Sequence, residues 1–233
     1  MSKQLFLPLQ LPDDETFESF IAGDNQMVIS HLQNWFATHT NAPFLTYISG
    51  EAGAGKSHLL YSLCAQVAGS GQTCAYISFK RIEELHPDFL TDLERVKLIC
   101  LDDIHLLEGQ ADWQRAVFDL INRVKEGGDG RLLVSALQGP GQLPLDLPDL
   151  RSRLSWGVSF HLRPLDDEQR LAALRSRANR RGISMPMEVG RFLLNHCHRD
   201  MPTLLAVLDK LDKSSLQAKH RLTVPFVKKV LNL

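Results

Sequence analysis

The chain has 233 residues, of which 44% are hydrophobic and 23% are charged, a composition typical of a folded protein with one or two domains. Collagen-like, disordered and disulfide-scaffold classes are excluded, and no stretch approaches the roughly 18 apolar residues that a membrane span needs. The formal net charge is −1, yet residues 1–150 carry 10 basic and 20 acidic side chains, whereas residues 151–233 carry 16 and 7. The chain is therefore acidic in its first part and basic in its second.

The N-terminal leader, residues 1–14, is rich in leucine and punctuated by proline. Its apolar run is short and is broken by Pro8 and Pro12, so it is neither the apolar region of a signal peptide nor a membrane span. Two interpretations are open: a tail that packs on the domain, or a peptide that docks into a pocket of another protein. The docking residues would be Gln4, Leu5, Leu7, Pro8 and Leu9.

Five apolar runs alternate with amphipathic segments in the middle of the chain, which predicts an α/β fold with a parallel sheet. The strands are expected at Phe44–Ser49, Thr73–Ser78, Lys97–Leu101, Arg131–Ser135 and Val158–Leu162. Helices are expected at Gln26–Thr38, Lys56–Ala68, Asp112–Glu126 and Pro148–Arg153. In the third of these helices apolar residues recur at helical spacing, and Gly127 is expected to end it.

From Pro164 onward strand signals cease and helical patterns follow, which predicts a small helical domain or lid. Asp166 is expected to cap a helix that ends before Gly182, with acidic residues in its first turn and basic ones in its last. The arginines of this helix are interpreted mostly as a solvated face. Later helices are expected at Glu188–His196, Thr203–Gln217 and Pro225–Leu231.

The segment GEAGAGKS satisfies the pattern GxxxxGK[ST] and lies between a predicted strand and a predicted helix. Its glycines let the backbone wrap phosphates with N–H groups inward, its lysine reaches the β- and γ-phosphates, and its serine binds Mg²⁺. The alternative is a glycine-rich turn with an exposed lysine. The predicted nucleotide-binding residues here are Gly50, Gly53, Ala54, Gly55, Lys56, Ser57 and His58, of which Ser57 is also a metal ligand.

Two adjacent aspartates, Asp102 and Asp103, end the apolar run LICLDD downstream of the phosphate loop. In this position Asp102 would hold Mg²⁺, usually through water, and Asp103 would polarise an attacking water molecule. Strands also end in aspartate simply to form turns. The catalytic and metal-binding interpretation therefore depends on the preceding phosphate loop.

The segment DLRSRLSWG (Asp149–Gly157) lies immediately before the last predicted strand. Arg151 and Arg153 are either solvated surface arginines or candidates for an arginine finger that reaches a neighbour's nucleotide. In the second case one guanidinium changes the rate of phosphoryl transfer by about 10³–10⁵. Sequence spacing leaves both interpretations open.

Four elements in this order resemble the AAA+ module of the bacterial replication initiator family, DnaA: ETFESFIAGDNQ (residues 15–26), GEAGAGKS, LDDI, and LRSRLSWG followed by a helical lid. The resemblance covers about residues 15–233. It implies a parallel five-stranded sheet of order 5-1-4-3-2 flanked by helices, with a C-terminal all-helical lid, and it places Phe17 and Phe20 beside the adenine. The implied divisions are a leader at 1–14, an AAA+ domain at 15–163 and a lid at 164–233.

The leader sequence QLFLPL resembles the motif by which partners bind the DNA polymerase sliding clamp. The chain ends where the initiator's helix-turn-helix DNA-binding domain would begin, so the likeness is to DnaA-homologous regulators of the initiator. Such a regulator binds the sliding clamp and stimulates ATP hydrolysis by DnaA through an arginine finger in trans, here Arg153. The resemblance thus implies a negative regulator of DNA replication initiation.

Further expectations concern partners and location. The near-zero net charge favours only weak or indirect contact with DNA. AAA+ modules associate head to tail, so a homodimer or oligomer is expected as well, and the opposite charges of the two parts of the chain would steer such an encounter. Four cysteines without a CxxC pair favour a cytoplasmic location.

The sequence departs from the family at two positions that normally contact the nucleotide. Leu137 falls where the resemblance implies a polar sensor residue, and Pro202 falls where it implies a lid arginine. We therefore expect bound ADP or ATP with Mg²⁺, but weak hydrolysis. The alternatives are a stand-alone P-loop ATPase or phosphotransferase, with the arginine-rich helix as its lid, and a DnaA-like helicase-loading factor.

Overall fold

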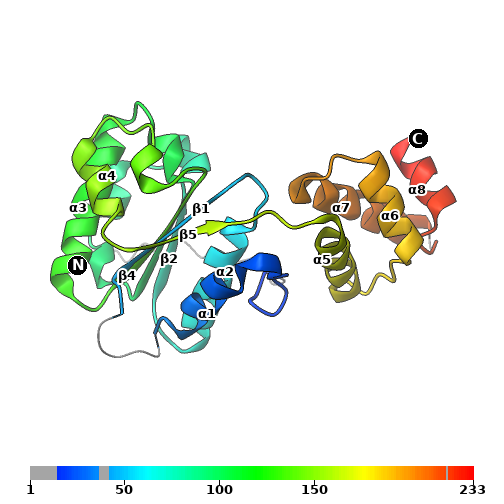
Figure 1. The fold of residues 1–233 in the computed structure, drawn as a ribbon, viewed down its shortest axis with the longest axis horizontal. Coiled ribbons are helices and arrows are strands. Elements are labelled where there is room, and N and C mark those ends of the chain that lie inside the picture. The colour runs from blue at the N-terminus through cyan, green and yellow to red at the C-terminus, as the bar shows by residue number, and fades with distance from the viewer. Residues whose placement is uncertain (1–14, 37–41, 219) are drawn as a thin grey trace.

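The computed structural model describes residues 15–36, 42–218 and 220–233. The chain forms an α/β domain followed by a cluster of helices, and a single extended segment after the last strand joins the two (Figure 1). The predicted docking residues of the leader, from Gln4 to Leu9, lie outside the described residues.

The α/β domain is built on one five-stranded parallel sheet. The strand order is β2-β3-β4-β1-β5, which confirms the order expected from the sequence. Because all strands run in the same direction, their carboxyl ends meet at one edge of the sheet, where ligands bind in open α/β folds. The strands are β1 (Leu45–Gly50), β2 (Cys74–Ser78), β3 (Leu98–Asp102), β4 (Arg131–Ala136) and β5 (Val158–Leu162).

Helices cover both faces of the sheet (Figure 1). Alternation of side chains along β3 produces the two faces: Leu98 and Cys100 belong to one buried cluster, and Ile99 and Leu101 belong to the other. Each buried leucine or isoleucine contributes about 1.5–3 kcal/mol to folding. The first face carries α1 (Gln26–Asn34) and α2 (Lys56–Gly69), and the second carries α3 (Ala111–Gly127) and α4 (Pro148–Leu154).

Several helix boundaries differ from the prediction. The first helix ends at Asn34, and its predicted end at Thr38 lies outside the described residues. The third ends at Gly127, because Gly128 with φ +78° forms the left-handed cap that Gly127 was expected to supply. Short 3-10 helices, which have no 3.6-residue periodicity, were not predicted. They are η1 (Gly23–Asn25), η2 (Phe79–Glu84), η3 (Pro87–Leu90), η4 (Leu93–Arg95), η5 (Ile104–Leu107) and η6 (Pro140–Gln142).

The C-terminal helices pack around their own apolar core, which includes Leu174, Leu193 and Leu208. The first of them begins with a capping box, in which the Asp166 side chain accepts from the Gln169 N–H and the Gln169 side chain accepts from the Asp166 N–H. These helices are α5 (Asp167–Arg180), α6 (Met187–His196), α7 (Met201–Ala218) and α8 (Val224–Leu231).

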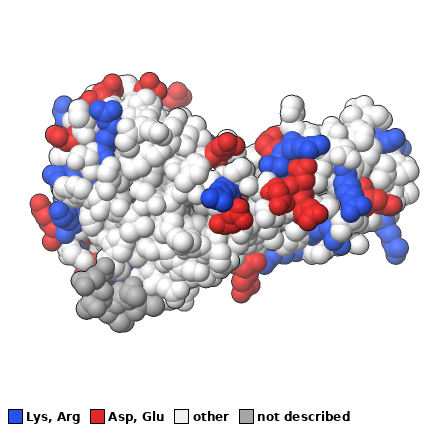
Figure 2. Space-filling model, in the orientation of Figure 1, with Lys and Arg blue, Asp and Glu red and all other residues white. Residues whose placement is uncertain are grey.

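The interpretation of the α5 arginines as mostly solvated is wrong for several of them, because they form ion pairs with nearby carboxylates. Arg170 pairs with Asp167 at 2.8 Å, and the neighbouring Arg181 pairs with Asp209. On the face shown in Figure 2, acidic and basic side chains are interleaved over the helical lid. The charge division along the sequence therefore does not appear as a one-signed lid surface in this view.

Within the part of the chain that the structure describes, no helix combines the length and the apolar character required to cross a bilayer.

Candidate functional site

The phosphate loop connects β1 to α2 at the carboxyl edge of the sheet, as the sequence predicts. Two of its glycines adopt backbone conformations that other residues rarely take, with φ +79° at Gly53 and +95° at Gly55. Neighbours also leave no room for side chains: a Cβ on Gly55 would lie 2.6 Å from the Phe20 ring, and one on Gly53 would lie 2.6 Å from Pro202 Cδ. The loop is therefore packed between an N-terminal aromatic ring and the lid.

Lys56 is the first residue of α2 and is only 6% exposed. Its ammonium group donates hydrogen bonds to the Gly50 carbonyl at 2.6 Å and the Glu51 carbonyl at 2.8 Å. Burial lowers the pKa of Lys56, while the carboxylates of Asp103 and Asp102 act in the opposite direction. Two of the three N–H donors of this ammonium group are thus used by the chain's own loop.

Asp102 ends β3 and is almost completely buried. One of its oxygens accepts hydrogen bonds from Ser57 Oγ and from the Tyr76 hydroxyl, both at 2.6 Å, and the other accepts from Ser135 Oγ. Burial, together with the Asp102 charge, raises the pKa of Tyr76, which keeps this hydroxyl a donor. The structure thus brings together the two predicted metal ligands, Ser57 and Asp102.

Asp103 follows directly and has a left-handed backbone with φ +61°, which is uncommon for a non-glycine residue. Its backbone N–H donates to Ser135 Oγ at 3.0 Å, and its Oδ2 lies 2.8 Å from Lys80 Nζ. The hydrogen bond to Asp103 is the main cause that raises the pKa of Lys80. The carboxylate predicted to polarise water is therefore ion-paired within the chain.

Phe17, Phe20 and His58 lie together on the N-terminal side of the loop. Both phenylalanines pack against the apolar cluster beneath α2, and the Phe20 ring meets the His58 ring edge-on at a centroid distance of 5.2 Å. His58 Nε2 lies 3.0 Å from the Thr16 carbonyl oxygen and 3.1 Å from Ser19 Oγ. His58, predicted as a nucleotide-binding residue, thus contacts the segment that precedes η1.

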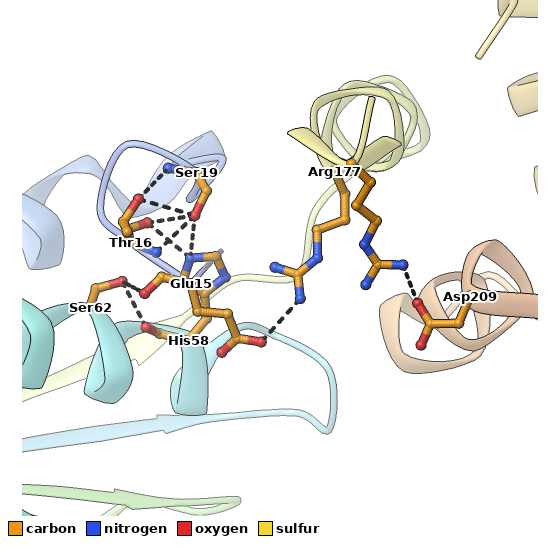
Figure 3. A network of polar contacts seen from close by, with 8 residues as sticks. Glu15, Thr16, Ser19, His58, Ser62, Arg177 and Asp209 are labelled. Atoms are coloured by element: carbon orange, nitrogen blue, oxygen red, sulfur yellow. Dashed lines mark hydrogen bonds and ion pairs between the residues drawn. The ribbon is translucent and has the colours of Figure 1, made fainter. Parts of the chain in front are cut away.

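The same N-terminal segment also reaches the lid (Figure 3). Glu15 Oε1 lies 3.5 Å from Arg177 Nη2 of α5, and the Glu15 carbonyl oxygen accepts from Ser62 Oγ of α2 at 3.4 Å. The Glu15 and Arg177 side chains are only 19% and 14% exposed. Nearby, the Asn25 amide pairs with both the N–H and the C=O of Arg163 in the segment between β5 and α5. The phosphate-loop helix and the lid are thus tied to one stretch of chain.

The two positions at which the resemblance predicted polar family residues are Leu137 and Pro202, and both side chains are apolar. Leu137 directly follows β4 and is 36% exposed, and Pro202 lies in the first turn of α7, beside Gly53. Neither side chain can donate a hydrogen bond to a phosphate.

Arg151 and Arg153 lie in the last turn of α4, on the face of the sheet opposite to α2. The structure therefore does not bring Arg153 to the chain's own phosphate loop. Its guanidinium carbon lies 3.7 Å from the centroid of the Trp156 ring and 5.3 Å from that of Phe118.

Sequence reasoning missed three residues that shape the site: Tyr76, Lys80 and Ser135. Tyr76 and Ser135 lie on the strands that flank β3, so the expected strand order together with their polar character offered a signal. Lys80 lies just beyond β2 in η2, and no pattern in the sequence pointed to it.

The parallel sheet, the phosphate loop and the helical lid define a P-loop nucleotide-binding protein of the AAA+ class. The family model "Bacterial DnaA ATPase domain" matches residues 11–161, and the model "Hda, lid domain" matches residues 167–231. The first match spans more than half of the sequence. The chain therefore belongs to the DnaA ATPase family, with a lid of the Hda type.

Solved structures show the same fold. Domain III of the DnaA protein of Thermotoga maritima is 23% identical with a TM-score of 0.82, over 95% of this chain and 97% of that one. DnaA of Aquifex aeolicus, which was solved with AMPPCP bound, is 20% identical with a TM-score of 0.73, over 89% and 67%. A RuvB variant of Thermotoga maritima is 14% identical with a TM-score of 0.70, over 95% and 72%.

Proposed function

We propose that this chain is a negative regulator of replication initiation that binds adenine nucleotide in its own site and promotes hydrolysis of the ATP held by DnaA. One contrast carries the proposal. Lys56, which binds its own loop, and Ser57, which donates to Asp102, are the proposed phosphate and metal residues, whereas Leu137 and Pro202 are apolar where the resemblance implies polar residues. Such a site favours binding over turnover.

The nucleotide is ADP or ATP, held on the loop Gly50–Ser57 with Phe17 and Phe20 bordering the base. The neighbouring hydroxyl of Ser57 and carboxylate of Asp102 fit Mg²⁺, which takes oxygen ligands in nucleotide complexes. These two residues would hold the ion, which would neutralise phosphate charge. The AMPPCP complex of the Aquifex aeolicus relative supports an adenine nucleotide.

The chain's own hydrolysis is slow in this proposal. Asp103, which would polarise water, is ion-paired with Lys80, and no polar side chain follows β4 at Leu137. The turnover of the isolated protein tests this point directly. A value near 10 s⁻¹, about that of an ordinary enzyme, would instead favour a stand-alone ATPase or phosphotransferase.

DnaA is the proposed partner, and Arg153 is the proposed arginine finger. The lid match of the Hda type supports a regulator that acts on the initiator. Because Arg153 lies away from the chain's own phosphate loop, it serves a nucleotide on another molecule. A head-to-tail association of AAA+ modules provides such a contact, and the same geometry allows a homodimer or oligomer.

The leader is the proposed attachment to the sliding clamp, and the division into 1–14, 15–163 and 164–233 is proposed with it. Replacing Gln4, Leu7 and Leu9 by alanine should remove clamp association in a pull-down, whereas replacing Lys3 and Gln10 should not. Unchanged clamp binding by the triple variant would contradict the docking interpretation and favour a leader that only packs on the domain. A cytoplasmic location is proposed as well, and it agrees with four free cysteines.

A reconstitution tests the proposed function as a whole. DNA-loaded clamp, ATP-charged DnaA and this protein are mixed, and the nucleotide bound to DnaA is followed with time. Conversion of ATP to ADP that requires both this protein and the clamp is the expected result. A conversion rate that is the same without this protein would contradict the proposal.

A further inference from the structure

Arg153 lies in a cluster of aromatic and basic side chains that differs from the surroundings of the α5 arginines. Phe118 and Lys125 come from α3, and Trp156 lies three residues beyond Arg153, just after α4. The guanidinium of Arg153 and the ammonium of Lys125 both lie 3.7 Å from the centroid of the Trp156 ring. The backbone N–H of Trp156 donates to the Arg153 carbonyl at 3.0 Å, which fixes the backbones of the two residues relative to each other.

The Arg153 guanidinium has no anionic partner among the described residues. Its Nε is buried without a hydrogen bond, and no carboxylate in the described part of the chain pairs with it. By contrast, Arg123 pairs with Glu94, and Arg177 pairs with Glu15. An aromatic face attracts a guanidinium and limits its rotamers but leaves its positive charge uncompensated. Arg153 is therefore ordered while its charge remains available.

We propose that Trp156 is a positioning residue for Arg153: its ring holds the guanidinium in the orientation that reaches a phosphate anion on a partner chain. This inference rests on the proposed role of Arg153. A guanidinium presents its N–H donors in a rigid plane, so its orientation decides whether two donors reach phosphate oxygens together. Lys125 adds a second positive charge beside the same ring, which favours approach of an anion. Trp156 is 40% exposed, so a partner can reach this cluster.

The role of Trp156 is tested with Trp156→Ala and Trp156→Phe, the second of which retains an aromatic face. The matched control is Phe89→Ala, because Phe89 is also 40% exposed but lies in η3, outside this cluster. Single-turnover hydrolysis of DnaA-bound ATP is measured over a range of regulator concentrations in the presence of loaded clamp. This series separates the maximal rate from the half-saturating concentration.

Trp156→Ala should lower the maximal rate about tenfold, because the finger loses its preset orientation, and should change the half-saturating concentration less than about threefold. Trp156→Phe should restore most of the rate, and Phe89→Ala should match the wild type. A change in half-saturating concentration alone would make Trp156 a contact residue and overturn the inference. A Trp156→Ala rate within about twofold of wild type would also overturn it.

Two further measurements distinguish a failure of this inference from misfolding of a variant and from a failure of the proposed function. Trp35 and Trp113 are 2% and 6% exposed, so quenching of tryptophan fluorescence by acrylamide mainly reports Trp156. Arg153→Ala should increase that quenching in the free protein, and unchanged quenching would contradict the contact. If Arg153→Ala abolishes DnaA stimulation but Trp156→Ala does not lower it, the inference fails and the proposed function stands. If Arg153→Ala stimulates normally, both fail.

Discussion

Two cations, Lys56 and Arg153, lie on opposite faces of the same sheet and are held in different ways. Lys56 is buried and donates to two carbonyl groups of its own loop. Arg153 contacts aromatic rings and has no hydrogen bond to its side chain among the described residues. Lys56 uses two of its three donors within its own loop, whereas the Arg153 side chain keeps its donors for an outside acceptor.

The difference assigns separate tasks to the two regions. Buried polar groups that are fully hydrogen-bonded rigidify a site, and this suits a phosphate loop that must keep its shape. A guanidinium that is ordered without a counter-ion is prepared to stabilise charge that develops on another molecule. In the proposed function, the chain combines a nucleotide site with weak turnover and an arginine that is available to a partner.

The largest effect on the first region is expected from Lys56→Ala. Hydrogen bonds to charged groups contribute about 1.5–3 kcal/mol, so the Kd for ADP with Mg²⁺ should rise about 10- to 100-fold. Isothermal titration calorimetry measures this change. Lys229→Ala is the control, because Lys229 is an exposed lysine of α8 in the lid, and its Kd should stay within about threefold of wild type. A Lys56→Ala protein with wild-type affinity would show that the loop does not bind phosphate through this residue.

A moderate effect is expected from Glu15→Gln, which removes the ion pair to Arg177. Because both side chains are mostly buried, the free energy of unfolding should fall by about 1–2 kcal/mol, between the values for exposed and fully buried pairs. Urea denaturation gives this value. Glu83→Gln replaces an exposed glutamate elsewhere and should leave stability unchanged. Equal stability of the two variants would mean that the lid is not held through Glu15.

The smallest effect concerns the pH dependence of stability and His31, which contacts Thr46 of β1. Burial, with a further contribution from Arg131, lowers the pKa of His31, whose Nε2 lies 2.9 Å from Thr46 Oγ1. The unfolded chain then binds more protons in the window just below the unfolded pKa of about 6.5. Stability should therefore be greatest above that pH and fall as the pH drops toward the folded pKa.

His31→Gln should flatten this dependence, because glutamine cannot take up the proton. Urea unfolding at pH 7.5 and at pH 5.5 compares the two proteins. His86→Gln, at an exposed histidine, should keep the wild-type slope. If His31→Gln kept the full slope, another group would be responsible for the loss of stability.

The sequence predicted the sheet and most helices because long apolar runs with clear periodicity dominate these elements. It did not predict the 3-10 helices between β2 and β3, where turns closed by local hydrogen bonds replace periodic burial. The observed helix ends also differ from the predicted ones, because a single capping residue such as Gly128 determines where α3 ends. Local backbone geometry of this kind is only weakly encoded in residue patterns.

Motif spacing indicated Lys56, Ser57 and Asp102 because phosphate binding constrains neighbouring residues along the chain. Contacts between distant segments were not predictable in the same way. Glu15 and Arg177 are 162 positions apart, and nothing local to either residue indicates the pairing. Arg153 and Trp156 are close in sequence, yet their contact depends on side-chain rotamers that only the packing of α4 on α3 decides.

One measurement tests the division between the two regions most directly. Wild type, Arg153→Ala and Arg153→Lys are compared in the reconstitution with loaded clamp and ATP-charged DnaA, and the binding of ADP by each isolated protein is measured in parallel. Arg153→Ala should stimulate hydrolysis about 10³-fold less than wild type, lysine should not restore the rate, and all three proteins should bind ADP equally. Normal stimulation by Arg153→Ala would contradict the division between the two regions.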